Sequence, residues 1–489
     1  MNILINQIVG YGSIAGGLMP DTLQTILETY PNANVYHLTC SNSFKTCFVN
    51  YSSKPEVCFK CKKGVKKSLM LVQGNFKLLT IDDIITEEDK QNAKRFIIDD
   101  YSLDKDIRSL KYENFSIGES SLSTYISATR DRDLEKLHKD NSFQEIIENG
   151  VALYSGLKKF LIRNEINVIY NFNGRHTYHK AALDLARELG IDCYNMEVVR
   201  PGGYLVRFKN ALPHNIKYVT HNVLKEWEDS TLSLKVKTKI GEDYFVKKRE
   251  RVQLNDKIYT ASQTVDLLPA KIDFTKRTIV LFTSSDDEFA AVGQEYDNPY
   301  FRDQNEGIFY VAELISQQND FNLIIRMHPN LKGVNHSYAN KLRSLKNKYK
   351  NVFLETPESK VDSYALLDVA DKVIVFGSTI GVEANYWKKP VILLGKSFYS
   401  DMDIAYKPRE KGDIKLLIKK ELLPKSKIDS IKFGYYYSEG GISSRYFKNS
   451  NKKIFFKGVK LFQYTWWEHK TAKIIKIVHR TLGIRLFVN

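Results

Sequence analysis

The feature that most constrains the fold is a regular alternation of apolar, strand-length runs with helical stretches in the second half of the chain. β-branched, apolar runs stand at 277–283, 323–326, 351–354, 373–376 and 391–394. Short connections between alternating strands and helices predict a doubly wound α/β domain with a parallel sheet. Because ligands bind such sheets where strands end and helices begin, we expect the polar ends of these runs to form one site.

The first part of the chain repeats this pattern. Strands are predicted at 1–8, 34–38, 167–172 and 191–197. A helix separates the members of each pair, which implies a second parallel sheet. The glycine-rich turn at 10–17 allows a ligand or another part of the protein to approach closely, or is a plain tight turn. It does not match a dinucleotide-binding fingerprint, since the glycine spacing differs and no acid closes the second strand.

Length and pattern together predict the domain organisation. A chain of 489 residues suits two or three domains. We expect an α/β protein with two Rossmann-like doubly wound domains, at 1–265 and 266–430, and a basic helical tail at 431–489. The border is placed where Pro269 interrupts the pattern.

The chain is basic, and the excess charge is concentrated at its end. The formal net charge is +16, and residues 431–489 hold twelve Lys/Arg against Glu439 and Glu468, which is +10 of the +16. This balance admits nucleic acid, an anionic membrane or acidic substrates such as nucleotide sugars. Neither a basic stripe nor a known nucleic-acid module is present, so no nucleic-acid partner is expected.

Aromatic residues at 455–467 are interleaved with lysines, and a helix is predicted beyond them. One side of this helix carries Lys470, Lys473, Lys476 and Arg480, and the other Ile474, Ile475, Val478 and Leu482. A basic amphipathic helix with nearby aromatics suits an anionic membrane surface. The alternative, a helix packed back on the body of the protein, is equally open.

Targeting signals are not evident in the sequence. The first residues have no basic lead and no long apolar core, and no stretch approaches about 18 uninterrupted apolar residues. We therefore expect a cytoplasmic protein, with a peripheral position at the inner membrane as an option. Its thiols are expected to be reduced.

Four cysteines fall within 22 residues. Cys40, Cys47, Cys58 and Cys61 include one Cys-x-x-Cys pair, while the six residues between the first two exceed the usual zinc-knuckle spacing. Four thiolates in a reducing compartment can hold a structural Zn²⁺. The alternative is free thiols in an irregular insertion. A redox pair is less favoured because no thioredoxin-like Trp or Pro context accompanies it.

Polar residues at a strand–helix junction in the second domain predict phosphate binding. Ser378 and Thr379 stand where a helix start offers N–H groups, and their hydroxyls add donors. Glu383, one turn further, could accept hydrogen bonds from ribose hydroxyls. A purely structural helix cap is the alternative.

His328 strengthens the prediction of a ligand site. It ends a strand before Pro329, with Arg326 two residues earlier on the same side of the strand. A histidine can donate to a phosphate as charge develops on the leaving group. Together with Ser284 and Ser285 at a neighbouring strand end, these residues predict a joint nucleotide site.

The first domain offers candidates for the second substrate. Asn173 and Arg175 follow the strand at 167–172, and Glu197 ends the next strand at the same sheet edge. Arg175 can bind an anionic or hydroxyl-rich ligand, or be an ordinary surface arginine. Glu119 lies in a polar stretch predicted as a loop before a helix at Tyr125, where it presents a carboxylate to a cleft or to solvent.

Three motifs carry a family resemblance. Arg-Met-His-Pro-Asn at 326–330, Gly-Ser-Thr-Ile-Gly-Val-Glu-Ala at 377–384 and Lys-Pro-Val-Ile-Leu-Leu-Gly at 389–395 resemble bacterial capsule and surface-polysaccharide biosynthesis proteins, which are GT-B-type glycosyltransferases. Segments at 282–288 and 171–175 are similar to parts of the same group. The resemblance covers much of residues 165–400 and only loosely the cysteine region and the tail.

The resemblance implies two Rossmann-like domains facing a cleft, with a nucleotide-sugar donor on the C-terminal one and no catalytic metal. Similar His-Pro and Ser/Thr motifs occur in transferases that use CMP-activated acidic sugars, which would place His328, Ser378 and Thr379 on the CMP. These motifs are shared widely among GT-B proteins, so they fix neither the sugar nor the nucleotide.

An inverting transfer needs a group that takes the proton of the acceptor hydroxyl. Glu197 and Glu119 are the candidates, with His328 as the catalytic residue on the donor side. The expected partners are a nucleotide-sugar donor and a lipid-linked or oligosaccharide acceptor.

Two other functions stay open. A nucleotide-sugar 2-epimerase shares the scaffold, but its Asp-Ser-Gly-Gly turn is replaced here by Phe-Gly-Ser-Thr-Ile-Gly at 376–381. A non-catalytic polysaccharide assembly protein on the same scaffold is the other alternative.

Overall fold

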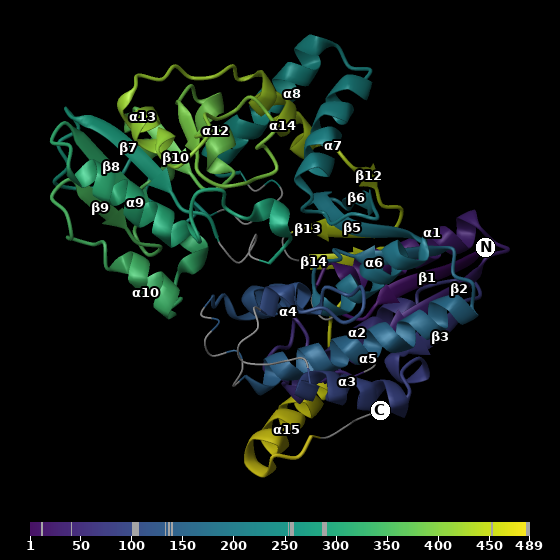
Figure 1. Ribbon diagram of the computed structural model, residues 1–489. Helices are drawn as coiled ribbons and strands as arrows, with labels where there is room; N and C mark the ends of the chain where they lie inside the picture. Colours follow the sequence, from purple (N-terminus) through teal and green to yellow (C-terminus); the bar gives the residue numbers. More distant parts are fainter. Residues whose placement is uncertain are drawn as a thin grey trace. The chain divides into compact units, whose positions relative to one another are not determined.

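The computed structural model describes residues 1–10, 13–40, 42–99, 107–132, 134, 137, 140–252, 254, 259–285, 291–450 and 453–485. The chain forms two compact units (Figure 1). Unit 1 comprises Met1–Arg130, Leu134–Pro213 and Gly441–Asn489, and unit 2 comprises Asp131–Asp133 and His214–Gly440. Each unit contains a largely parallel sheet flanked by helices, which confirms the predicted α/β class with two Rossmann-like domains.

Unit 1 is built on a seven-stranded sheet with the order β12-β6-β5-β4-β1-β2-β3. Its strands are β1 Asn2–Gln7, β2 Asn34–Thr39, β3 Lys77–Thr80, β4 Val168–Phe172, β5 Asp192–Arg200, β6 Tyr204–Lys209 and β12 Ile442–Ser443. Five neighbouring strands of this sheet, β5, β4, β1, β2 and β3, run parallel. β6 and β12 are antiparallel to their neighbours. The four strands predicted from the first part of the chain lie in the parallel section.

Helices of unit 1 surround this sheet. They are α1 Ala15–Thr29, α2 Pro55–Leu69, α3 Glu87–Asp99, α4 Ile117–Thr129, α5 Asn141–Arg163, α6 Thr177–Leu189 and α15 Trp466–Leu482. Local signals explain several ends: Asp140 accepts hydrogen bonds from the first N–H groups of α5, and Gly190 ends α6 with a φ of 69°.

The prediction of a polar loop at 118–123 is wrong, because these residues form the first half of α4. The small polar side chains of this segment are buried rather than solvated. Ser121 and Thr124 contact the Thr177 hydroxyl at 3.4 and 2.9 Å. Packing against α6 therefore overrides the local preference of serines for turns.

The C-terminal segment folds as part of unit 1. β12 extends the main sheet, and β13 Phe447–Ser450, β14 Lys453–Phe456 and β15 Val459–Lys460 form a second, antiparallel sheet. The buried carboxylate of Asp21 on α1 accepts hydrogen bonds from the backbone N–H groups of Tyr446 and Phe447 at 2.6 and 3.0 Å. This segment is thus more than the helical tail that was predicted.

The glycine-rich turn at the start of α1 serves this packing. A Cβ atom at Gly16 would lie 2.1 Å from the Phe462 ring, and one at Gly17 would lie 2.6 Å from Ile454. Tyr11 and Gly12 lie outside the described residues. The close approach expected at this turn is therefore made by the C-terminal segment.

Unit 2 is built on a five-stranded sheet with the order β11-β10-β7-β8-β9, and each neighbouring pair runs parallel. The strands are β7 Arg277–Phe282, β8 Phe321–Arg326, β9 Val352–Glu355, β10 Lys372–Val375 and β11 Val391–Leu393. All five coincide closely with the predicted apolar runs. The helices are α7 Ile216–Asp229, α8 Leu234–Arg249, α9 Gln304–Ser316, α10 Ser337–Arg343, α11 Ser363–Val369, α12 Ile380–Tyr386, α13 Asp413–Lys419 and α14 Ile428–Glu439.

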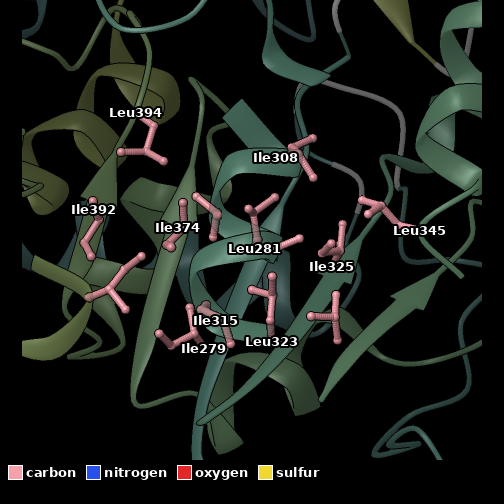
Figure 2. Close-up of a cluster of buried hydrophobic side chains, with 14 of the residues drawn as sticks. Ile279, Leu281, Ile308, Ile315, Leu323, Ile325, Leu345, Ile374, Ile392 and Leu394 are labelled. Carbon is pink, nitrogen blue, oxygen red and sulfur yellow. The ribbon is translucent and has the colours of Figure 1, made fainter. Parts of the chain in front are cut away.

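The core of unit 2 lies between its sheet and the covering helices (Figure 2). Side chains from adjacent strands, including Ile279, Leu281, Leu323 and Ile374, pack against Ile308 and its neighbours on α9. Because both faces of a parallel sheet are covered, its strands are continuous apolar runs, as the sequence shows.

Helices α7 and α8 belong to unit 2, together with α14, although residues 214–265 are sequentially close to unit 1. A Cβ atom at Gly434 of α14 would lie 2.4 Å from the Gly241 carbonyl oxygen of α8, so these helices cross in close contact. The units thus divide the chain near 213 and 440, rather than at the predicted 265 and 430. Within the described residues, none of the helices combines the length and apolar character that a membrane span requires.

Candidate functional site

The strand order of unit 2 places a switch point between β7 and β10. The connection that leaves β7 leads to β8 on one side, and the one that leaves β10 leads to β11 on the other. In open parallel sheets the crevice between two such strands is the usual ligand site. In this sheet the residues that follow the two strands are 283–285 after β7 and 376–379 after β10, the positions at which the sequence predicts a nucleotide site.

Ser284 has an unsatisfied hydroxyl at this switch point. Its backbone N–H donates to Gln304 Oε1 at 2.6 Å, and its side chain is 5% exposed. Within the described residues its Oγ has no hydrogen-bond partner. Since a buried hydroxyl without a partner costs free energy, this atom marks a position that a polar ligand can satisfy.

Gly377 keeps the space beside this hydroxyl open. Its φ is +147°, and a Cβ atom here would lie 2.8 Å from the Lys396 carbonyl oxygen and 3.8 Å from Ser284 Oγ. Only glycine fits this conformation and this spacing without strain. The ends of β7 and β10 therefore approach each other closely through Ser284 and Gly377.

A hydrogen-bonded turn holds His328 at the end of β8. The His328 N–H donates to Thr283 Oγ1 at 2.9 Å, and the Asn330 N–H donates to His328 Nδ1 at 3.1 Å. The Asn330 amide also donates to Ser285 Oγ at 3.0 Å. Because Nδ1 accepts a hydrogen bond, the neutral ring carries its proton on Nε2 and presents a donor there.

Ser378 and Thr379 are half-exposed at the start of α12. Thr379 occupies the N-cap position, but its side chain makes no capping hydrogen bond. The Ser378 carbonyl accepts a hydrogen bond from the Tyr399 hydroxyl at 2.7 Å, which fixes the backbone of this junction. The alternative of a purely structural helix cap therefore does not apply to the side chain of Thr379.

Arg326 does not join this edge. It is 2% exposed, and its guanidinium donates to the Thr356 and Ser359 carbonyl oxygens at 2.7 and 3.1 Å. Burial lowers its pKa, and the nearby carboxylates of Glu355 and Glu358 oppose this shift. The structure gives Arg326 the role of holding the loop after β9, in contrast to the predicted ligand contact.

Glu383 also has a structural environment. Its buried carboxylate accepts hydrogen bonds from Lys248 Nζ at 3.0 Å and from the Tyr364 hydroxyl at 2.6 Å. Burial, followed by the charge of Glu383, raises the pKa of Tyr364, so this hydroxyl remains a donor. The carboxylate therefore links α12 to α8 and α11 through these two hydrogen bonds. The predicted contact was with ribose hydroxyls.

In unit 1 the candidate residues after β4 and on β5 do come together, although Glu197 lies within β5, which continues to Arg200, and does not end the strand as predicted. The Asn173 amide donates to Glu197 Oε2 at 2.7 Å, and Arg175 Nη2 donates to Ser127 Oγ on α4 at 3.1 Å. The Arg175 N–H also donates to Asn173 Oδ1 at 3.3 Å. This edge therefore presents a carboxylate and a guanidinium, as expected for a site that binds a hydroxyl-rich or anionic substrate.

An asparagine ladder supports this edge from within the sheet. Asn6, Asn171 and Asn195 lie in register on three adjacent strands. The Asn6 amide donates to Asn171 Oδ1 at 3.1 Å, and the Asn171 amide donates to Asn195 Oδ1 at 2.8 Å. A Cβ atom at Gly174 would lie 2.6 Å from Asn195 Oδ1, so the ladder also shapes the turn.

Glu119 lies apart from the contact that Arg175 makes with α4. It is in the first turn of α4, eight residues before Ser127. At 1.5 Å per residue this is about 12 Å along the helix axis. Its neighbour Ser120 offers its carbonyl oxygen to the Thr177 hydroxyl at 3.2 Å. Glu197, the other predicted base, accepts a hydrogen bond from Asn173 in the turn after β4.

The four clustered cysteines line one cavity of about 430 Å³ in unit 1. Cys40 follows β2, Cys47 lies in a loop, and Cys58 and Cys61 lie on α2, which replaces the irregular insertion considered from the sequence. Burial raises the pKa of the Cys40 thiol to about 12. Across the part of the chain that the structure describes, no group of three or more His, Cys, Asp or Glu is arranged to hold a metal ion.

The sequence analysis did not identify several residues that shape the candidate site of unit 2. Thr283, Gln304 and Asn330 orient the predicted residues, and Gly377 sets the spacing between the two strands. Asn330 and Gly377 belong to the motifs that carry the resemblance, and they stand close in sequence to His328 and Ser378. This closeness was the signal that could have identified them as site residues. Residues 286–288 of the motif after β7 lie outside the described residues.

Comparisons with known proteins bear on this region. Residues 251–410, which are 160 of the 489 residues, match the family model described as capsule polysaccharide biosynthesis protein. No curated protein matches the chain.

Solved structures are similar at low identity. Two KpsC structures from Thermosulfurimonas dismutans, a beta Kdo 2,4 transferase and a beta Kdo 2,7 transferase, are 12% and 16% identical, with TM-scores of 0.36 and 0.34. They cover 58% and 57% of this chain, and 80% of each of their own chains. The UDP-GlcNAc 2-epimerase of Methanocaldococcus jannaschii is 14% identical, with a TM-score of 0.28, and covers 88% of this chain and 98% of its own. At these scores the likenesses carry no argument about function.

The family match includes the edge that contains Ser284, His328 and Ser378. The predicted resemblance to capsule and surface-polysaccharide biosynthesis proteins is thereby confirmed for residues 251–410, which match this family model.

Proposed function

We propose that this protein is a metal-independent glycosyltransferase that moves a sugar from a nucleotide-sugar donor to a capsule or cell-surface polysaccharide acceptor. The observation that carries the proposal is the buried Ser284 hydroxyl, which lacks a partner among the described residues and lies beside Gly377 at the switch point of unit 2. The capsule family match over the same region supports it.

The edge of unit 2 has the groups that a nucleotide sugar needs. The hydroxyls of Ser284, Ser378 and Thr379 can donate to phosphate oxygens. His328, held by Thr283 and Asn330, directs its Nε2 proton as a further donor. When the bond between the anomeric carbon and the phosphate oxygen breaks, negative charge grows on the nucleotide, and donors placed in advance stabilise it. We propose that the donor is a CMP-activated acidic sugar.

The edge of unit 1 supplies the acceptor chemistry in this proposal. The acceptor hydroxyl oxygen forms the new bond to the anomeric carbon, and its proton passes to a carboxylate. Glu197 is the preferred base because Asn173 fixes its carboxylate at 2.7 Å. Arg175, oriented by Ser127, would bind an anionic group of the acceptor.

We further propose that α15 places the protein on an anionic membrane that carries a lipid-linked acceptor. The helix packs on α2 through Ala472 and Ile475, which contact Phe59. Its outer face instead carries Trp466 and Trp467, which are 64% and 68% exposed, with Ile474, Ile477, Lys470 and Lys473. Exposed aromatic and aliphatic groups among cations suit the interface of an anionic bilayer. The packed face agrees with the alternative of a helix that packs back on the protein, and the exposed face supports the proposed membrane contact.

The test is a panel of nucleotide sugars incubated with and without lipid-linked and oligosaccharide acceptors. Nucleotide release that requires an acceptor supports the transferase. His328→Ala is expected to lower kcat/KM by about 10²–10³-fold, because it removes one donor to the developing charge. His221→Ala, which removes an exposed histidine from α7, is the matched control.

Other results would point to the alternatives. Interconversion of the donor without any acceptor indicates a 2-epimerase. Donor binding without turnover, unchanged by His328→Ala and by Ser284→Ala, indicates a non-catalytic assembly protein. Titration with CMP and with UDP separates the nucleotide choice from the question of transfer.

A further inference from the structure

Unit 1 contains an elongated cavity of about 430 Å³ that the proposed transfer reaction does not use. It lies at the carboxyl ends of three neighbouring strands, where Val9, Cys40 and Thr80 line it. Its long wall is α2 with its C-cap residue, from Val57 to Met70. At 1.5 Å per residue this wall is about 20 Å long. Ligand pockets have volumes of about 300–1,000 Å³, and a long space at the lower end of this range suits a single hydrocarbon chain.

Most side chains that line this cavity are apolar. Ile8, Phe44 and Val65 are buried in its wall. The thiols in the wall add to this character, because burial raises the pKa of Cys40 to about 12 and raises that of Cys47 as well. A thiol that keeps its proton behaves as a small apolar group. The wall therefore favours an apolar ligand.

The cavity opens at the C-terminal end of α2. Lys66, Met70 and Leu78 line it and are exposed to solvent, so they mark the opening. The side chains of Met70 and Leu78 are 76% and 53% exposed. Exposed apolar groups beside a lysine suit the contact of an amphiphile with both its chain and its headgroup.

Two lysines of α2 give this cavity positive charge. Lys62 and Lys66 lie one turn apart, and both line it. The adjacent Lys67 forms an ion pair with Glu468 of α15, with 2.7 Å between Nζ and Oε2. In the part of the chain that the structure describes, neither Lys62 nor Lys66 has such a carboxylate partner. The two ammonium groups therefore favour a ligand with an anionic headgroup.

The same end of α2 adjoins the exposed tryptophans of α15. Trp466 and Trp467, which are 64% and 68% exposed, directly precede Glu468. Glu468 in turn binds Lys67, the neighbour of Lys66 at the opening. The surface that we propose to contact the membrane thus continues to the opening of the cavity.

We propose that this cavity holds one hydrocarbon chain of an anionic membrane lipid, with the headgroup at Lys62 and Lys66. The lipid anchors unit 1. Since neighbouring strands lie about 4.8 Å apart, β3 at the opening is roughly 19 Å from β5, which carries Glu197 four strand spacings away. A headgroup at the opening is too distant from this candidate base to accept a sugar. The proposal shares the membrane contact of α15 with the proposed function but requires no transferase activity.

The experiment titrates the full chain, without a donor, with 1-acyl glycerophosphates of increasing chain length below their micelle concentrations. Calorimetry measures the affinity. We expect it to increase about fourfold per added methylene and to become constant once the chain fills the cavity. An affinity that continues to increase with chain length, as in adsorption to a surface, would overturn the proposal, and so would the absence of binding.

Variants test the wall and the headgroup contact separately. Cys61→Trp fills the middle of the α2 wall and should move the limit to shorter chains. Lys62→Gln combined with Lys66→Gln should weaken binding by about 10–25-fold, since each cation contributes about fivefold. Lys63→Gln, on α2 but outside the cavity lining, is the matched control. Equal affinity of the wild-type protein for neutral monoacylglycerols of the same chain length would overturn the anionic headgroup.

A second measurement covers the case in which Cys61→Trp does not fold. A 1-acyl glycerophosphate with a photoreactive group at the end of its chain is irradiated on the wild-type protein, and the labelled residues are identified by mass spectrometry. Labels on wall residues such as Phe44, Val49 and Phe76 support the proposal. Labels confined to α15 would overturn it.

A final arm adds nucleotide sugars to the protein with its bound lipid. We expect the lipid to keep its mass, because its headgroup lies away from Glu197. A lipid that gains the mass of a sugar would overturn the anchoring role and identify the lipid as an acceptor.

Discussion

The main sheets of the two units hold their polar residues in different places. In unit 2, the central strands β7, β8 and β10 are largely apolar and buried along their length, and the polar groups begin where the strands end. In unit 1, polar residues lie inside the strands themselves: Asn6, His37, Asn171 and Asn195 are all buried. The first sheet thus has a hydrogen-bond network between the side chains of adjacent strands, whereas the buried polar side chains of the second, such as Asn322, Arg326 and Lys372, stand near the strand ends and bond to carbonyl oxygens outside the sheet.

The edges of the two sheets differ in the same way. At the edge of unit 2, Ser284 Oγ has no partner in the described part of the chain, and Gly377 keeps space beside it. At the edge of unit 1, Asn173 and Glu197 are bonded to each other. A ligand of unit 2 therefore meets a hydroxyl with unused hydrogen-bonding capacity, whereas a ligand of unit 1 meets side chains that are already bonded to each other.

The largest expected effect tests the edge of unit 1. If Glu197 is the acceptor base, Glu197→Gln lowers kcat by about 10²–10⁴-fold, because the amide cannot take the proton. Donor affinity, measured by titration calorimetry, should not change, since the proposed donor site is in unit 2. Glu119→Gln is the parallel variant: if it lowers kcat while Glu197→Gln does not, the base lies on α4 and the proposed role of Glu197 is wrong.

The next effect tests the edge of unit 2. Gly377→Ala forces a Cβ atom into a backbone conformation that costs on the order of 1–3 kcal/mol for other residues. The new atom would also lie 2.8 Å from the Lys396 carbonyl oxygen. We expect a decrease of about 2 kcal/mol in the free energy of unfolding, measured with denaturant, and weaker donor binding.

Gly412→Ala is the matched control for this variant. Gly412 has an ordinary φ of −64°, and a Cβ atom added there would have Glu410 Oε1 as its nearest neighbour, at 3.7 Å. Equal stability and equal donor binding in both variants would show that the narrow spacing between β7 and β10 is not required.

Two buried histidines, His37 on β2 and His179 on α6, make unit 1 sensitive to acid. Burial lowers the pKa of His37 to about 3 and that of His179 to about 4, from the ordinary 6.5. Below pH 6.5 the unfolded chain binds protons that the folded chain does not, so the free energy of unfolding decreases as the pH falls. Each histidine contributes a slope of about 1.4 kcal/mol per pH unit between 6.5 and its folded pKa.

Hydrogen exchange of β1 and β2 against β7 and β8 at pH 7 and pH 5 measures this difference. The strands of unit 1 should lose protection at pH 5, and His37→Gln should reduce that loss. An equal loss of protection in both sheets would show that the polar interior of unit 1 does not set its acid stability.

The smallest expected effect concerns α15 on the surface of unit 1. Lys473→Ala should weaken binding to vesicles with anionic lipids by about fivefold, since one cation near such a surface contributes about 1 kcal/mol. Lys346→Ala removes an exposed lysine from unit 2 and is the control. Sedimentation with anionic and with neutral vesicles measures both. Equal binding of all three proteins would exclude α15 as the membrane contact.

Local sequence pattern was sufficient for the strands and for the position of the candidate site. The five apolar runs of unit 2 became β7 to β11, because a strand covered on both faces must be apolar throughout. Ser284, His328 and Ser378 meet at one edge for the same reason: parallel strands place their carboxyl ends together.

The orientation of individual side chains did not follow from the pattern. Arg326 precedes His328 by two residues, yet its guanidinium turns to the carbonyls after β9. Glu383 lies in the first turn of α12 beside the site, yet its carboxylate is bonded to Lys248 and Tyr364. In both cases the partner lies on an element distant in sequence, and a buried charge adopts the orientation in which it is paired.

The sequence by itself determined two α/β units, the strand ends that form the candidate donor site, and the clustering of four cysteines in one short segment. Only the tertiary structure decided that residues 118–123 are a buried helix, that the C-terminal segment completes unit 1, and that the four thiols surround a cavity. The physical reason is the range of the interactions. Strand and turn signals act between neighbouring residues, whereas burial and pairing depend on contacts that the chain makes only after folding.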